Sequence, residues 1–477
     1  MILEKIVKGI IYLGTIKEIW IFLGGILLGY FTFKFSTLLI FAILGLIGFG
    51  YLFVNPTFGV LAVLGFIPVG ILGTLTEADI PVVLSLIRFL GMGAAGAWAI
   101  NTALKKTKLT YVPMTNAIIL FGTIAFVSFW FATSKPAAFG ALFIIVNQIV
   151  YYFLVVNTIK TEKLLRAFIW TMVISNGLLA LFGIIQFIGA NPFATLIATR
   201  GVGITRISGT TGDANWLAML IVIVIPITIY WFIGETVPWK KTLLLWTAIA
   251  QILTTTFTYS RMAALGLGLM AIIIMVKQKV KPSTVFAVVG LSAILAPLLP
   301  AAYWDRVYSM AFVETDFAIS VRLELQKAAL KMIVDYPVLG VGVGNFGVNL
   351  FRGYLDITKV YGGAIHRVEA FTLTGAHNLY LDTAANMGLL GSGTLIFMIA
   401  YGWRELRKFQ KFFKQHNNLQ MMYLCHGIET SLAVFCFCSI FLHSLATKYF
   451  WILFSTIAVI RYIYGSRGIN GKKMEKN

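Results

Sequence analysis

Charged side chains are scarce in this sequence. Asp, Glu, Lys and Arg make up 12% of its 477 residues, whereas 59% are hydrophobic and the mean hydropathy is +0.88. A soluble domain needs a polar surface, so this composition excludes an ordinary soluble protein. Apolar runs of about 17–25 residues recur almost end to end, and this is the length that crosses a bilayer as a helix. The sequence therefore predicts an all-α, polytopic membrane protein.

Cysteine is rarer still, and motifs for metal or nucleotide binding are missing. The three cysteines, Cys425, Cys436 and Cys438, lie in or beside one late apolar run without CxxC spacing. We expect them to be buried or lipid-facing, because neither a disulfide nor a metal site suits that pattern. No GxSxG, Walker or HExxH motif occurs, and the carboxylates between the apolar runs are scattered. The sequence predicts no metal site and no cofactor.

One glycine-rich string, GVGNFG at residues 342–347, matches GxGxxG formally. A dinucleotide site needs a strand before that string and a helix after it. Here an amphipathic helical pattern precedes it and an aromatic, polar stretch follows. We therefore interpret these glycines as a helix end that permits close backbone approach.

The apolar runs predict about 14 transmembrane helices, within a range of about 12–14. They lie near residues 19–33, 36–53, 57–75, 83–104, 113–133, 138–159, 163–190, 212–234, 240–258, 260–277, 283–300, 385–403, 422–444 and 446–464. Most of the 38 Lys and Arg residues fall in alternate connections. This asymmetry places both termini in the cytoplasm, and it explains the net charge of +20 without a nucleic-acid partner.

The same orientation divides the chain into three parts. Residues 1–299 hold the N-terminal transmembrane helices, residues 300–384 form one large extracytoplasmic loop, and residues 385–477 hold the last helices and a cytoplasmic tail. Within the loop, Ser320–Tyr336 is amphipathic at helical spacing and is suited to the outer membrane interface. A loop of this length is usually functional or disordered, and its amphipathic pattern favours a functional one.

Several arginines occur on the outer side, against the positive-inside bias. One interpretation is that they reach lipid headgroups or pair with nearby carboxylates. The other is a cluster that binds a phosphorylated headgroup, because guanidinium is permanently charged and forms paired hydrogen bonds to phosphate oxygens. The candidates are Arg206, Arg261 and Arg322, with Arg200 beside them and Arg88, inside a predicted span, as a secondary candidate.

His377 lies where the chain re-enters an apolar phase, on the same side as the arginines. A neutral imidazole can take a proton from a hydroxyl, and nearby arginines would lower its pKa. On sequence grounds the rate should then fall below about pH 6. The alternative is a helix cap at the membrane surface. Asn378, Tyr380 and Asp382 are secondary candidates, although Asp382 is poorly spaced to contact His377 directly.

Four motifs in order resemble the O-antigen ligase / O-antigen polymerase superfamily of bacterial membrane glycosyltransferases. They are RISGTTGDANWLA after a long apolar run, TYSRMA at the start of another, Arg322 followed by DYPVLGVGVGNF, and AHNLYLDTAANMGLLG. The resemblance covers roughly residues 160–405, and the first 160 residues share only their apolar, helical character.

The resemblance implies an inverting, metal-independent transfer of a glycan from undecaprenyl diphosphate to an acceptor hydroxyl at the outer leaflet. In that family pattern, His377 is the base and Arg206, Arg261 and Arg322 bind the diphosphate. The acceptor stays open between a lipopolysaccharide core, another lipid-linked repeat and a protein hydroxyl. The alternative from another class is a transporter or flippase of lipid-linked saccharide, although no inverted repeat or carboxylate relay is visible.

Overall fold

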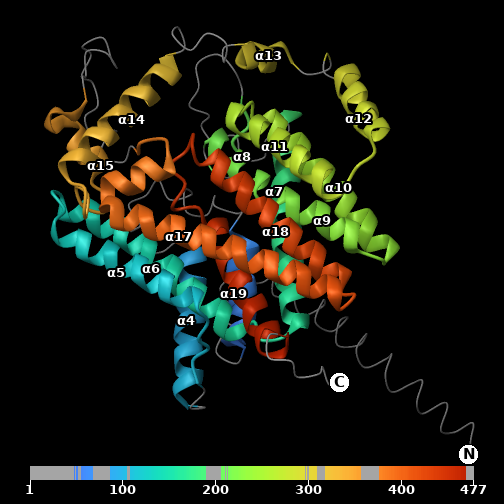
Figure 1. Ribbon diagram of the computed structural model, residues 1–477, viewed down its shortest axis with the longest axis horizontal. Helices are drawn as coiled ribbons and strands as arrows, with labels where there is room; N and C mark the ends of the chain where they lie inside the picture. Colours follow the sequence, from blue (N-terminus) through green and yellow to red (C-terminus); the bar gives the residue numbers. More distant parts are fainter. Residues whose placement is uncertain are drawn as a thin grey trace, which may run out of the picture.

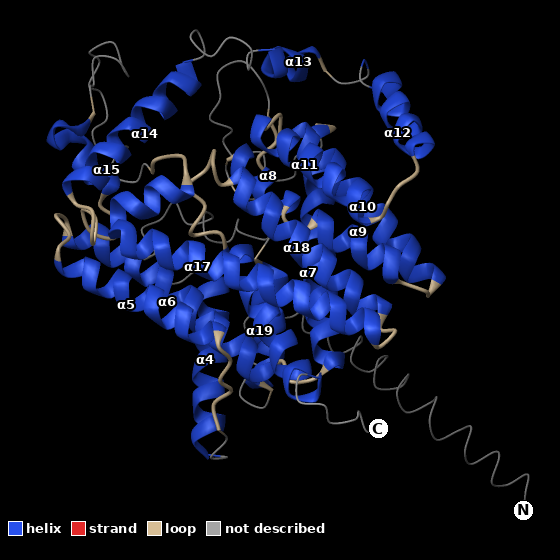
Figure 2. Ribbon diagram, in the orientation of Figure 1, coloured by secondary structure: helices blue, strands red, loops and turns tan. Residues whose placement is uncertain are grey.

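The structure is a computed structural model that describes residues 48, 50–51, 55–67, 86–104, 108–189, 206–209, 211, 213–295, 297, 300–308, 317–355 and 375–468. In this part of the chain the regular elements are all helices, and none is a strand (Figures 1 and 2). The predicted all-α class is therefore confirmed. The predicted span near 19–33 lies outside the described residues, as does most of the span near 36–53.

The helices follow the remaining apolar runs closely. In chain order they are α3 (Pro56–Phe66), α4 (Leu86–Leu104), α5 (Met114–Trp130), α6 (Lys135–Thr158), α7 (Glu162–Phe187), α8 (Ala214–Val222), α9 (Ile225–Gly234), α10 (Pro238–Phe257), α11 (Arg261–Lys277), α12 (Pro282–Leu295), α13 (Ala301–Tyr308), α14 (Phe317–Asp335), α15 (Phe346–Asn349), the π-helical turn η5 (Leu350–Tyr354), α17 (Leu379–Gln415), α18 (Leu419–Cys438) and α19 (Lys448–Gly468).

Within the described residues, five helices are long and apolar enough to cross a membrane. They are α6, α7, the pair α8 and α9 taken together, α17 and α18. This identifies a multi-pass membrane protein and agrees with the hydropathy. The total of about 14 spans stays a prediction.

Two predicted spans have a different course in the structure. The span near 212–234 is broken into α8 and α9, because Pro226 in the first turn of α9 has no backbone N–H to continue the ladder. The span near 385–403 is part of a longer helix, α17, of 37 residues. α17 is kinked at Gly388, whose φ of 67° is left-handed, and Leu389 N there donates to Pro337 O at 2.7 Å.

α14 realises the predicted amphipathic helix, with boundaries within three residues of those expected. Its apolar face packs on protein instead of lying open to lipid. α14 contacts α17, and four residues of this face are buried: Leu325, Ala328, Ala329 and Met332. The physical reason is that Ala376, just before α17, and Ala385, in its second turn, offer a matching apolar surface.

The glycine string after α14 forms a tight turn against α5 and α6. Gly342 has a φ of 104°, and a Cβ there would lie 2.3 Å from the Cα of Ala132. Next to it, Asn345 Oδ1 accepts a hydrogen bond from Ser134 N at 2.6 Å, and Asn345 Nδ2 donates to Ser134 O at 3.2 Å. The turn therefore fixes the far end of α14 to the helical bundle.

α18 runs through the middle of the bundle and packs on α9, α11 and α17 (Figure 1). Twelve of its 20 residues are buried, in agreement with this central place. After α18 ends, Ser439 O accepts a hydrogen bond from Leu379 N at 2.8 Å. The segment that follows α18 is thereby held against the start of α17.

Candidate active site

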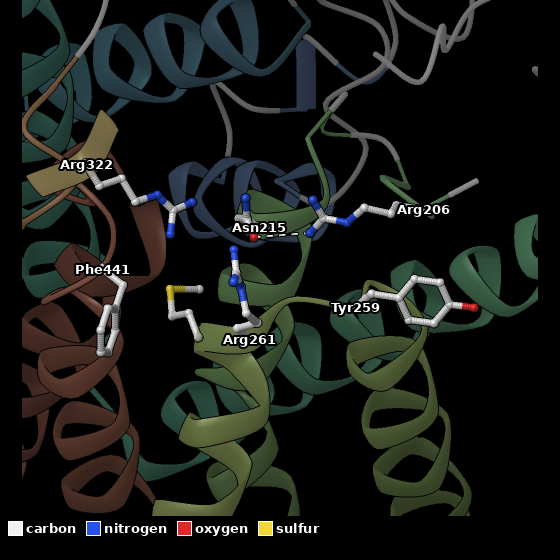
Figure 3. A pocket seen from close by; sticks show the side chains of 7 residues that line it. Arg206, Asn215, Tyr259, Arg261, Arg322 and Phe441 are labelled. Atoms are coloured by element: carbon white, nitrogen blue, oxygen red, sulfur yellow. Dashed lines mark hydrogen bonds between the residues drawn. The ribbon is translucent and has the colours of Figure 1, made fainter. Parts of the chain in front are cut away.

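Three arginines from distant parts of the chain converge on one cavity of about 150 Å³ (Figure 3). Arg206 precedes α8, Arg261 opens α11, and Arg322 lies in the second turn of α14. The remaining lining is one amide and three apolar or aromatic side chains, which are those of Asn215, Tyr259, Met262 and Phe441. Among the described residues no carboxylate lines this cavity. The site is therefore strongly cationic.

Arg206 is oriented by a small hydrogen-bond network. Its Nε donates to the backbone carbonyl of Thr258 at 2.9 Å, and one terminal nitrogen donates to Asn215 Oδ1 at 3.2 Å. Ser260 Oγ donates to the same oxygen at 3.0 Å. Because Asn215 is held from both sides, the guanidinium of Arg206 is positioned before any ligand arrives.

The backbone on both sides of the cavity is fixed by less obvious residues. Gln186, at the end of α7, accepts hydrogen bonds through Oε1 from Ser208 N at 3.2 Å and from Gly209 N at 2.9 Å. Tyr259 has a φ of 51°, in the left-handed region that side chains rarely adopt. Such backbone strain is concentrated at functional sites, where the surrounding structure enforces it.

Helix direction adds to the positive potential. Arg261 and Met262 are the first two residues of α11, and both line the cavity. The N-terminus of a helix carries partial positive charge and directs backbone N–H groups outward. Three guanidinium groups and one helix N-terminus therefore face a space of the right size for a phosphate group.

His377 lies immediately before α17, in a left-handed conformation with a φ of 49°. The N-cap of α17 is the next residue: Asn378 Oδ1 accepts from Tyr380 N at 3.0 Å and from Leu381 N at 3.1 Å. The helix cap considered for His377 is thus provided by Asn378. The His377 side chain therefore takes no part in capping α17.

Those surroundings include a second histidine. The rings of His377 and His443 meet edge to face with centroids 5.1 Å apart, and His443 meets Trp216 in the same way at 5.9 Å. Gly375 makes this approach possible, because a Cβ there would lie 2.4 Å from the His443 ring and 2.9 Å from Asp382 Oδ1. His377, His443 and Asp382 thus form one cluster beside the arginine cavity.

The pKa of His377 is lowered to about 3, first by burial and then by the electrostatic influence of His443 and Arg322. The lowering of this pKa agrees with the expectation from sequence, but burial lowers the pKa more than Arg322 does. The ring is therefore neutral at physiological pH and can accept a proton.

The other predicted residues serve the local fold or lie elsewhere. Tyr380 donates its hydroxyl to Cys436 O at 2.9 Å, which joins α17 to α18. Asp382 Oδ1 accepts from Ala376 N at 2.8 Å, so it holds the backbone before His377. Arg200 lies outside the described residues. Arg88 lies in the first turn of α4, and its side chain is also outside them.

Sequence reasoning did not single out Asn215, Gln186 or His443. Asn215 lies inside a quoted motif, GDANW, so its place directly after the helix cap Asp213 was a usable signal. Gln186 and His443 carry no local signal, because each reaches the site only through the packing of separate helices. Among the described residues, no group of three or more His, Cys, Asp or Glu side chains is arranged to hold a metal ion.

The fold and the site define a multi-pass helical membrane protein with a cationic cavity beside a half-buried histidine. Comparison with protein families gives a more particular result: residues 243–397 match the O-antigen ligase family. The match confirms the resemblance drawn from the motifs, at the level of the O-antigen ligase / O-antigen polymerase superfamily. It includes Arg261, Arg322 and His377, whereas Arg206 lies outside it. No curated protein matches the chain.

Proposed function

We propose that this protein is a membrane glycosyltransferase of the O-antigen ligase or polymerase type. It transfers a glycan from undecaprenyl diphosphate to an acceptor hydroxyl, with inversion and without a metal ion. The observation that carries this proposal is the convergence of Arg206, Arg261 and Arg322 on one cavity, close to a neutral histidine. The O-antigen ligase match supports a transferase at the family level.

The chemistry follows from this arrangement. His377 accepts the proton of the acceptor hydroxyl while the hydroxyl oxygen forms a bond to the anomeric carbon of the donor sugar. The bond from that carbon to the diphosphate breaks on the opposite face, so the configuration inverts. The diphosphate leaves with the electron pair, and the guanidinium groups stabilise the charge that develops on its oxygens.

Purified protein with the lipid-linked glycan from its native host should release undecaprenyl diphosphate only together with a new glycosidic bond to an acceptor, which for a polymerase is a second molecule of the lipid-linked glycan itself. The reason is that the displacement needs both the anomeric carbon and an incoming hydroxyl. Mass spectrometry of the lipid and glycan products measures this directly. Release of free glycan without a new glycosidic bond would contradict the proposal. Transport of intact donor between leaflets without release would contradict it too and would favour the flippase.

The acceptor distinguishes the members of this group of reactions. A lipopolysaccharide core would make the protein a ligase, a second lipid-linked repeat would make it a polymerase, and a serine or tyrosine hydroxyl would make it a protein transferase. Supplying these three acceptors separately in the same assay assigns the activity, because each gives a product of a different mass.

We further propose that the protein lies in the plasma (inner) membrane with both termini in the cytoplasm and residues 300–384 outside. Beyond the kink, the part of α17 from Gly388 to Gln415 is about 40 Å long at 1.5 Å per residue, more than the roughly 30 Å hydrocarbon core. His377 stands at one end and a basic cluster at the other: Arg404, Arg407, Lys408 and Lys411. The positive-inside rule then places the basic end in the cytoplasm.

Cysteine substitutions at Lys331 and Lys411 should be labelled from opposite sides of the membrane. Both side chains are exposed, and they belong to α14 and to the far end of α17. An impermeant maleimide added to intact cells should modify Lys331→Cys but not Lys411→Cys until the cells are permeabilised. The parent chain is the control: Cys425 and Cys438 are buried, and any labelling of the half-buried Cys436 is measured there as background. Labelling of both variants in intact cells would overturn this orientation.

A further inference from the structure

A row of aromatic rings leads away from the arginine cavity. It begins at Tyr259, which lines the cavity, and continues through three rings of α13: Tyr303, Trp304 and Tyr308. Successive ring centroids are 6.0, 5.4 and 6.4 Å apart. Nothing in the proposed chemistry at His377 uses these four residues, which we call the aromatic row.

The placement of the aromatic row suggests a ligand that extends beyond the diphosphate. Figure 3 shows Tyr259 on the Arg206 side of the cavity, opposite Arg322 and Phe441, with its ring directed away from Arg261. In Figure 1, α13 lies at the edge of the molecule beyond α8 and α11. The row therefore runs from the cavity away from the helical bundle.

Exposure increases along the aromatic row. Tyr259 is 5% exposed, Tyr303 and Trp304 are partly buried, and Tyr308 is 65% exposed. The first two contacts, Tyr259 with Tyr303 and Tyr303 with Trp304, are edge to face. Aromatic faces carry negative partial charge, and in saccharide binding they pack against the C–H groups on one face of a sugar ring. Rings in this arrangement suit successive sugars of a short chain.

We propose that the aromatic row binds the saccharide rings of the lipid-linked donor. This inference rests on the proposed function, because the donor is the ligand whose diphosphate occupies the arginine cavity. Its sugars are bonded to that diphosphate, and the first ring of the row lines the same cavity. The acceptor hydroxyl lies beside His377, on the face of the anomeric carbon opposite the diphosphate, and does not need the aromatic row.

The simpler explanation is membrane anchoring, since Tyr and Trp are enriched at bilayer interfaces. The chain offers a matched control for it. Trp130, at the end of α5, is 64% exposed and contacts Phe126 and Phe129. The loop just after it is held by the hydrogen bond from Ser134 N to Asn345 Oδ1. Trp130 has the same indole side chain as Trp304, but among the described residues it makes no contact with the aromatic row.

Binding to full-length protein in nanodiscs tests the proposal without requiring turnover. The two probes are undecaprenyl diphosphate and the undecaprenyl-diphosphate-linked glycan from the native host. Trp304→Leu should weaken binding of the glycan-bearing lipid about tenfold, the size expected for one lost aromatic stack, and leave undecaprenyl diphosphate unchanged. Trp304→Phe should restore most of the affinity, and Trp130→Leu should alter neither probe.

Three results would overturn the proposal. They are unchanged binding of the glycan-bearing lipid to Trp304→Leu, equal weakening of both probes, and a rise in KM for the acceptor in place of the donor. Failure of the proposed function looks different. In that case wild-type protein transfers no glycan to any acceptor, while the difference between the two probes in Trp304→Leu persists.

Discussion

His377→Ala should reduce the transfer rate by about 10²–10⁴-fold, the contribution of a positioned general base. Folding and donor binding should be nearly unchanged, because Asn378, and not His377, caps α17 and the proposed diphosphate site consists of the arginines. His377→Gln should be similarly slow, since an amide cannot accept the proton. The measurement is a single-turnover rate with saturating lipid-linked donor.

The pH dependence gives a second, independent check. An ordinary histidine would become protonated below about pH 6.5 and stop acting as a base. Burial, and to a smaller extent the electrostatic influence of His443 and Arg322, lowers the pKa of His377 to about 3 in the free protein. The acid limb of kcat/KM should therefore not appear near pH 6, in contrast to the expectation from sequence alone.

Binding of the donor should shift the acid limb of the pH–rate profile. Its diphosphate brings negative charge beside Arg322, which favours the protonated ring and raises the pKa of His377 in the complex. Because kcat reports the complex and kcat/KM the free protein, the acid limb of kcat should lie at higher pH. Near-normal turnover of His377→Ala would refute the assignment, and the neighbouring His443 and Asp382 would become the groups to examine.

Arg261→Lys should lower the transfer rate at least tenfold even though the positive charge is kept. An ammonium group cannot make the paired hydrogen bonds that guanidinium makes to two phosphate oxygens. Arg261→Ala should be slower still, by about 10²–10³-fold, as found when one donor to a developing oxyanion is removed. The measurement is kcat together with the affinity for undecaprenyl diphosphate.

Arg404→Lys is a suitable control for this prediction. Arg404 lies on the far half of α17, stacks on Tyr401 at 5.3 Å and lines a different cavity. It should turn over like the wild type, because it is remote from the diphosphate. If Arg261→Lys is equally active, Arg261 serves only to anchor the helix at the lipid headgroups.

The local sequence pattern was sufficient to predict where these helices lie. The runs that became α5, α6, α7, α10 and α11 were predicted to within a few residues, because a membrane helix of about 20 apolar residues needs no distant partner to be recognisable. The same holds for α14, whose boundaries follow from its own 3.6-residue periodicity. The kink at Gly388 was not predicted, since it depends on the backbone of Pro337 and Val338, which pack against it.

The candidate site also has features that the sequence determined and features that only the tertiary structure determined. The sequence by itself determined which residues were unusual: Arg206, Arg261 and Arg322 run against the charge bias, and His377 opens an apolar helix. Only the tertiary structure decided that the three arginines line one cavity, that Gln186 and Asn215 support them, and that His443 meets His377. These contacts join residues far apart in the chain, and their geometry follows from how α7, α8, α14, α17 and α18 pack, which no local periodicity encodes.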